Sequence, residues 1–150
     1  MPYSNPKFTA PKLLGFEYGM VAGSMAYVAY ASDGNFYYTR DPSSTEPLIK
    51  LPRPPGVLCM DMPVYGNGWW MALSPCDRVS YYTTRDLADT VWNNHSMQDG
   101  FGDEFVWDGS LFRTPLVFLP NADSRKPGKF VMGGNQGDYE KEWMRLLTAE

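Results

Sequence analysis

The sequence predicts a single all-β domain made of three diverged strand-rich repeats, and three observations support this fold class. The chain has 150 residues, of which 43% are hydrophobic, and this is enough to bury one core. Its 14 glycines and 13 prolines show no collagen-like period, so they indicate many short strands joined by tight turns. Two segments also repeat an apolar strand, a polar turn and a second strand, which is typical of repeat architectures.

The repeat is clearest in residues 25–45 and 69–90. Each segment ends in Tyr-Tyr followed by Thr-Arg-Asp-x-x-x-Thr, with four identities at a constant offset: Thr39/Thr84, Arg40/Arg85, Asp41/Asp86 and Thr45/Thr90. We interpret Thr39, Asp41, Thr84 and Asp86 as residues of structural turns, because aspartate and threonine side chains bind the backbone of such turns.

The chain divides into an extended N-terminal arm over residues 1–12, which carries three prolines, and a repeat domain over residues 13–150. The units cover approximately residues 12–55, 56–109 and 110–150, a period of about 45 residues that suits propeller blades or trefoil repeats. The third unit has no Thr-Arg-Asp and is inferred from strand-like runs over 111–119 and 129–132.

Turn residues place the strands. In the first unit a strand over residues 13–18 precedes the repeated segment, whose polar turn is Ser-Asp-Gly-Asn at 32–35. In the second, a strand over 57–65 leads into the Tyr-Gly-Asn-Gly turn at 65–68. Prolines in residues 51–56 predict a linker, because proline lacks the N–H donor of a sheet ladder. Residues 139–147 are a strand if the repeat holds, or a short helix by their periodicity, and both alternatives stay open.

Residues 39–45 and 84–92 resemble the Asp-box, Ser/Thr-x-Asp-x-Gly-x-Thr-Trp, of sialidase-like β-propellers, and the second also looks like blades of propeller glycosidases. The central glycine is Ser43 or Ala88 here, and Val91 is inserted before Trp92. Asp-boxes are structural turns in that family, so the resemblance implies propeller-blade geometry and not activity. An ordinary propeller has four to eight blades. Three units would therefore pair with a second chain, form an open stack completed by partners, or close as a β-trefoil.

Charge and composition exclude several classes. The net charge of −4 and the absence of a basic cluster argue against nucleic-acid binding. The longest weakly polar stretch, residues 19–31, is too short to span a bilayer, so no membrane partner is expected. The N-terminus has no apolar signal region, so we expect a protein made in the cytoplasm. Cys59 and Cys76 are expected to be two buried free thiols, with a disulfide as the alternative.

No catalytic, metal or cofactor site is expected. Asp61 lies in an apolar run and Asp103, Glu104 and Asp108 lie in an aromatic loop, but carboxylates at strand edges or bulges explain them without a paired glycosidase site. The one histidine, His95, lies in a turn-like segment over 92–96 and forms no triad. Asp99, Asp103 and Glu104 lack the alternation of a calcium loop, and zinc ligands are missing.

Aromatic residues beside polar ones are the best binding candidates, since flat apolar faces suit sugar rings and protein contacts alike: Trp69, Trp70, Trp92, Phe101, Asp103 and Trp107. We expect a non-enzymatic structural or interaction module that assembles with itself or with a larger particle, such as a decoration, tail or adhesion protein of a phage virion. The alternatives are a glycan-binding, lectin-like module and a reduced propeller glycosidase.

Overall fold

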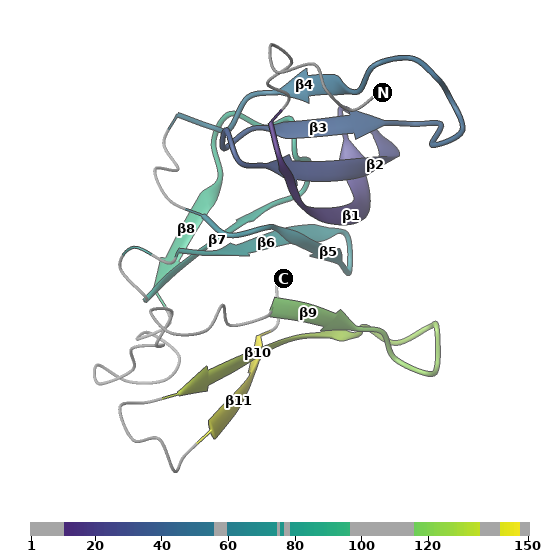
Figure 1. Ribbon diagram of the computed structural model, residues 1–150. Helices are drawn as coiled ribbons and strands as arrows, with labels where there is room; N and C mark the ends of the chain where they lie inside the picture. The colour runs from purple at the N-terminus through teal and green to yellow at the C-terminus, as the bar shows by residue number, and fades with distance from the viewer. Residues whose placement is uncertain are drawn as a thin grey trace, which may run out of the picture.

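The computed structural model describes residues 11–55, 60–74, 76, 79–96, 116–135 and 142–147. All regular structure in these ranges is β-strand, arranged in three antiparallel sheets that lie one above another (Figure 1). No helix in this part of the chain is long and apolar enough to cross a membrane. The predicted all-β fold class is therefore confirmed.

Each sheet is built from consecutive strands. The first sheet contains β1 (Leu13–Val21), β2 (Ser24–Ala31), β3 (Phe36–Thr39) and β4 (Ile49–Leu51), in that order. The second contains β5 (Val64–Gly66), β6 (Trp69–Leu73), β7 (Ser80–Thr84) and β8 (Asn93–Ser96), again in chain order. The third contains β9 (Leu116–Leu119), β10 (Lys129–Asn135) and β11 (Glu142–Leu147), with β10 in the middle.

The first hairpins of the first two sheets close through two-residue turns in which both residues have positive φ. Ala22 and Gly23 have φ values of 49° and 86°, and Asn67 and Gly68 have values of 53° and 79°. Such turns match the right-handed twist of the flanking strands. The Asn-Gly turn was predicted, as was the turn over residues 32–35, where Gly34 has a φ of 82°.

The core lies between the sheets. Successive side chains of a strand point to opposite faces, so a strand of the middle sheet can contribute to the core on each side. One cluster joins Val28 and Phe36 of the first sheet to Trp70 and Ala72 of the second. The intervening residues of β6 point the other way, and Met71 packs in a second cluster that faces the third sheet. The second sheet is therefore buried on both faces.

Several expectations need correction. Residues 93–96 are strand β8 and not the predicted turn, since they pair with β7. The strand expected over residues 57–65 is confined to β5, residues 64–66, while residues 56–59 lie outside the described ranges. The strand-like run 111–119 contains β9 over its last four residues, and residues 111–115 are not described. Of the two alternatives for residues 139–147, the structure has the strand over 142–147.

The expectation of buried free thiols is wrong for Cys76, which is exposed and disulfide-bonded. Cys76 therefore forms a covalent S–S bond and does not pack as a small buried hydrophobic residue. The chain's other cysteine, Cys59, lies outside the described residues, as do residues 1–10 of the N-terminal arm.

The close approach of the first two sheets predicts a specific stability effect at Gly19. A Cβ atom there would lie 2.3 Å from Cζ2 of Trp70 and 2.7 Å from Cγ of Tyr65, so Gly19→Ala forces rigid rings apart. We expect a loss of about 1–3 kcal/mol in the free energy of unfolding by urea, as for other overpacked cores. The matched control is Gly15→Ala, whose Cβ would meet the flexible Met62 side chain at 3.2 Å and should cost less. Equal losses of stability in the two variants would contradict the tight packing between the first two sheets at Gly19.

Candidate functional site

The two Thr-Arg-Asp loops have the same local structure. The hydroxyl of Thr39 donates to the carbonyl oxygen of Asp41 at 2.9 Å and accepts from its N–H at 3.1 Å. Thr84 makes the same two contacts with Asp86, at 3.1 and 3.4 Å. In each loop the aspartate carboxylate also accepts the N–H group two residues further along, at 3.0 and 2.9 Å. Each loop is therefore an Asx-type turn closed by its own aspartate.

The carboxylate of Asp86 also contacts the first sheet. Its Oδ1 accepts the N–H of Ala22 at 2.7 Å, and its Oδ2 accepts the N–H of Gly23 at 2.8 Å. Successive N–H groups of residues in such turn conformations form a small anion-binding concavity. The loop between β7 and β8 thus holds the turn between β1 and β2 by a charge-assisted contact.

The electrostatic environment keeps Asp86 ionised. Burial alone would raise the pKa of its carboxyl group. Hydrogen bonds from the N–H groups of Ala88, Gly23 and Ala22, together with the charge of Arg40, outweigh burial and lower the pKa below its ordinary value. The contact between the two sheets is therefore made by a carboxylate anion.

Arg40 binds the carbonyl side of the same turn. Its Nη1 donates to the carbonyl oxygens of Ser24 and Met25 at 3.0 and 3.2 Å, and its Nη2 donates to that of Val21 at 2.8 Å. The turn is consequently bound on its N–H side by Asp86 and on its C=O side by Arg40. These two residues come from different copies of Thr-Arg-Asp.

Where the apolar residues of the first two sheets pack together, one backbone carbonyl group of β1, that of Met20, accepts two hydrogen bonds. Nε1 of Trp70 donates to the carbonyl oxygen of Met20 at 2.8 Å, and the N–H of Leu87 donates to the same oxygen at 3.1 Å. The indole ring can approach the backbone so closely because Gly19 has no side chain.

Asp41, the counterpart of Asp86, is exposed and holds no such turn within the described ranges. Its two side-chain contacts both come from Ser43, whose N–H and hydroxyl donate to Oδ1 at 3.0 and 2.6 Å. The Ser43 hydroxyl, followed by the Ser43 N–H, lowers the pKa of this carboxyl group. Its Oδ2 has no hydrogen-bond donor among the described residues.

The face of the first sheet that points away from the second sheet is aromatic and exposed. Tyr18 and Tyr27 are paired across β1 and β2, are each 46% exposed, and have ring centroids 4.7 Å apart. Phe16, two residues before Tyr18, is 74% exposed. A hollow of about 420 Å³ opens on this face, lined by Phe16, Tyr27, Tyr37, Pro42 and Leu48 among others. We call this surface the outer face of the first sheet.

A second hollow of about 540 Å³ lies where the first strands of the three sheets meet. Its lining includes the carboxylates of Glu17 and Asp61 and the rings of Tyr65 and Phe118. The N–H of Asp61 donates to the carbonyl oxygen of Leu73 at 2.9 Å, which ties this segment to β6. The cleft therefore combines acidic and aromatic groups.

The three predicted ligand-binding residues that the structure describes do not form one exposed surface. Trp70 is fully buried and Trp92 is 7% exposed, and both pack in the core between the first two sheets. Trp69 points to the other face of β6, where the Arg85 guanidinium lies 3.9 Å from its ring centroid. Phe101, Asp103 and Trp107 lie outside the described residues.

His95 is a strand residue with local partners. Its Nε2 lies 2.8 Å from the Thr83 hydroxyl, and its ring stacks on Tyr81 with centroids 4.8 Å apart. In the part of the chain that the structure describes, no three His, Cys, Asp or Glu side chains are grouped as metal ligands. Asp99, Asp103, Glu104 and Asp108 lie outside that part.

Sequence reasoning missed both the bound turn and the outer face. The turn is Ala22-Gly23, an inconspicuous pair inside a long apolar run. The outer face has a weak signal, because Phe16 and Tyr18 alternate along β1 with Glu17 and glycine.

Comparison of the chain with protein-family models, with curated proteins and with solved structures finds no match.

The different partners of the two aspartates predict different contributions to stability. Asp86→Ala should lower the free energy of unfolding by about 2–3 kcal/mol, because it removes three charge-assisted hydrogen bonds, two of which join the second sheet to the first. Asp41→Ala removes contacts only within an exposed loop, so we expect a loss of about 0.5–1 kcal/mol. Urea unfolding of both variants measures the difference. A loss at Asp41 as large as that at Asp86 would show that the seam contact adds nothing.

Proposed function

We propose that this chain is a non-enzymatic structural and interaction module that docks another β-sheet on the outer face of its first sheet. Through this contact it assembles with copies of itself or with a larger particle. One observation carries the proposal: the outer face of the first sheet and its rim carry the residues that lie 45 positions before those on the face of the second sheet that the first sheet covers.

The correspondence follows the offset of the two Thr-Arg-Asp loops. The face of the second sheet that packs on the first carries Trp70, Ala72 and Leu87, all buried, and the partly buried Tyr82. The residues 45 positions earlier lie on the outer face of the first sheet or at its rim: Met25, Tyr27, Pro42 and Tyr37. A surface of this kind is therefore already used once in this molecule to pack two sheets together.

The energetics favour covering this face. Single exposed hydrophobic residues are normal on a protein surface, but several on one face indicate an interaction site. Phe16, Tyr18 and Tyr27 are exposed on adjoining positions of β1 and β2. Burying apolar surface contributes about 25 cal/mol per Å², so covering these rings strongly favours association.

Self-association through this face can be tested with Phe16→Asp. The ring is 74% exposed, so its replacement should leave the fold intact while placing a charge in the proposed contact. We expect the wild type to have a solution mass above the 17.0 kDa of one chain by light scattering, and Phe16→Asp to reduce it to that value.

The matched control is Val91→Asp, which charges another exposed apolar position, 83% exposed, on the loop after β7. Circular dichroism should show the same fold for all three proteins. A wild type that stays at 17.0 kDa at concentrations up to hundreds of micromolar would refute the proposed assembly.

Glycan binding is the second candidate function, favoured by the acidic and aromatic cleft between the first strands of the sheets. Aromatic rings and carboxylates are the groups that bind the faces and hydroxyls of sugars. If this function holds, wild-type protein binds oligosaccharides on a glycan array, and Asp61→Asn loses that binding. Glycoside turnover abolished by the same substitution would instead support the reduced glycosidase.

A further inference from the structure

The third sheet also has an open apolar face. Val117 and Leu119 of β9 are 44% and 52% exposed. The residue between them, Phe118, points the other way and packs with Phe130 toward the second sheet. The exposed residues therefore lie on the face of the third sheet that does not pack on the second sheet. On this face Val131, the cross-strand partner of Val117, is 6% exposed, and Val117 also lines the hollow between the first strands of the three sheets.

The pairing of the strands shows that this face of the third sheet corresponds to the face of the first sheet that packs on the second sheet. Next to the first turn of each sheet, the paired residues are Val21↔Ser24, Gly66↔Trp69 and Leu119↔Lys129. Two positions further from the turn they are Gly19↔Ala26, Val64↔Met71 and Val117↔Val131. Leu119 and Val117 thus occupy the positions of Val21 and Gly19, through which the first sheet packs on the second.

The contact between the first two sheets shows how such faces pack in this molecule. The first sheet contributes aliphatic side chains and the ring of Phe36, and the second contributes aliphatic side chains with the rings of Trp70 and Trp92. The exposed residues of the third sheet are aliphatic and those on the outer face of the first sheet are aromatic, so a contact between them would also bury apolar surface on both sides.

Charge is complementary where the loops would meet. At the existing seam the β1–β2 turn lies on Asp86, and the connection in the third sheet that corresponds to this turn is the loop over residues 120–128. This loop carries Arg125 and Lys126, both exposed, and the Arg125 side chain is 89% exposed. On the first sheet, the counterpart of Asp86 is Asp41, whose Oδ2 has no donor among the described residues.

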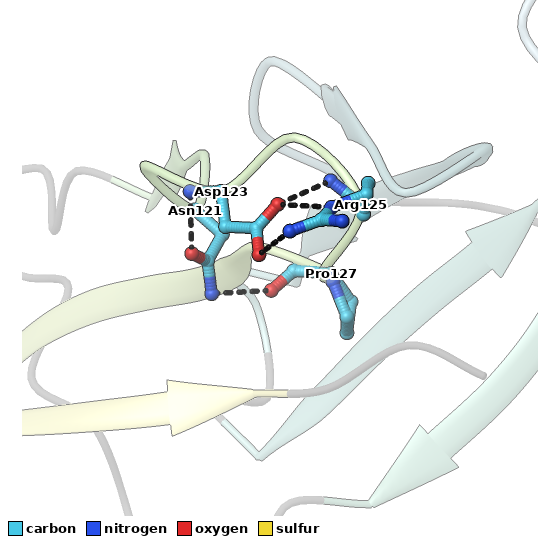
Figure 2. Close-up of polar contacts among 4 residues, drawn as sticks. All are labelled: Asn121, Asp123, Arg125 and Pro127. Atoms are coloured by element: carbon cyan, nitrogen blue, oxygen red, sulfur yellow. Dashed lines mark hydrogen bonds and ion pairs between the residues drawn. The ribbon is translucent and has the colours of Figure 1, made fainter.

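The loop is held in one conformation by its own polar contacts. Asp123 accepts the N–H of Arg125 at 3.0 Å and pairs with its guanidinium at 3.1 Å, while Asn121 accepts the N–H of Asp123 and donates to the carbonyl oxygen of Pro127 (Figure 2). The end of the loop is fixed to the second sheet, because the Asn67 amide exchanges two hydrogen bonds with the backbone of Gly128. The conformation of this loop is therefore stabilised by contacts within one copy of the chain.

From these observations we infer that the occupant of the outer face is the third sheet of a second copy of this chain. This inference rests on the proposed function and specifies its partner. Each copy has one open aromatic face and one open aliphatic face, so two copies bury all four through two identical contacts about a twofold axis. The product is a closed ring of six sheets, within the four to eight blades of ordinary propellers.

The experiment compares Leu119→Lys with Phe16→Asp by light scattering after size exclusion, with Val91→Asp as the control. We expect the wild type and the control at twice 17.0 kDa, and each of the other variants at 17.0 kDa or with a dissociation constant raised at least about tenfold. Both substituted side chains are exposed, and unfolding curves equal to that of the wild type show that each variant folds.

Mixing gives a second readout. In an equimolar mixture, the Leu119→Lys variant supplies an unmodified aromatic face and the Phe16→Asp variant supplies an unmodified aliphatic face. The mixture therefore forms dimers that neither variant forms alone. A Leu119→Lys protein that stays dimeric while Phe16→Asp is monomeric would overturn the inference and leave the proposed function standing, since the first sheets would then pack on each other. A monomeric wild type would overturn both.

Discussion

The arrangement of this protein depends on one contact, the carboxylate of Asp86 on the two N–H groups of the β1–β2 turn. Those N–H groups belong to an exposed turn, and the Asp86 carboxylate binds them through charge-assisted hydrogen bonds, which are stronger than neutral ones. Asp86 supplies both acceptor atoms from the second sheet, at 2.7 and 2.8 Å. Arg40 binds the carbonyl groups of the same turn from the first sheet. The turn therefore has one favourable position, and this position fixes how the first sheet lies on the second.

Because side chains alternate along a strand, the second sheet packs on the first sheet with one face and on the third sheet with the other. In β6, Trp70 faces the first sheet and Met71 faces the third, so its unbroken apolar sequence suits a strand that is buried on both sides. Strand β2 has a similarly apolar sequence, Ser-Met-Ala-Tyr-Val-Ala-Tyr-Ala, although only one of its faces packs on the second sheet. A strand with one face in water normally alternates apolar and polar residues. The composition of β2 is thus that of an inner sheet, which is the physical reason to expect a partner on its other side.

Much of the fold could be predicted from local signals. The Asn67-Gly68 turn and the turn containing Gly34 follow from the conformational freedom of asparagine and glycine, and the Thr-Arg-Asp loops follow from their constant spacing. The partners of those loops could not be predicted, because the contact of Asp86 with Ala22 joins residues more than sixty positions apart and depends on how the sheets stack.

The tryptophans show the same limit at the candidate site. Sequence suggests that Trp69, Trp70 and Trp92 could form one binding surface, whereas the alternation of β6 separates the first two and the core encloses the last two. Conversely, the exposed Phe16 and Tyr18 are ordinary strand residues in the sequence. Only the pairing of β1 with β2 shows that they share a face with Tyr27.

The two aspartates show that the same loop motif can bind a neighbouring sheet, as Asp86 does, or leave one carboxylate oxygen without a donor among the described residues, as Asp41 does. Asp86 has donors on both oxygens, two of them from the neighbouring sheet. In Asp41 both donors belong to Ser43 and both bind Oδ1; the residue at the corresponding place in the other loop is Ala88, which has no hydroxyl. A carboxylate has about four acceptor positions, so the serine stabilises the loop without occupying them all. Asp41 is consequently satisfied in the single chain and keeps Oδ2 as an acceptor for the partner that we propose on this face.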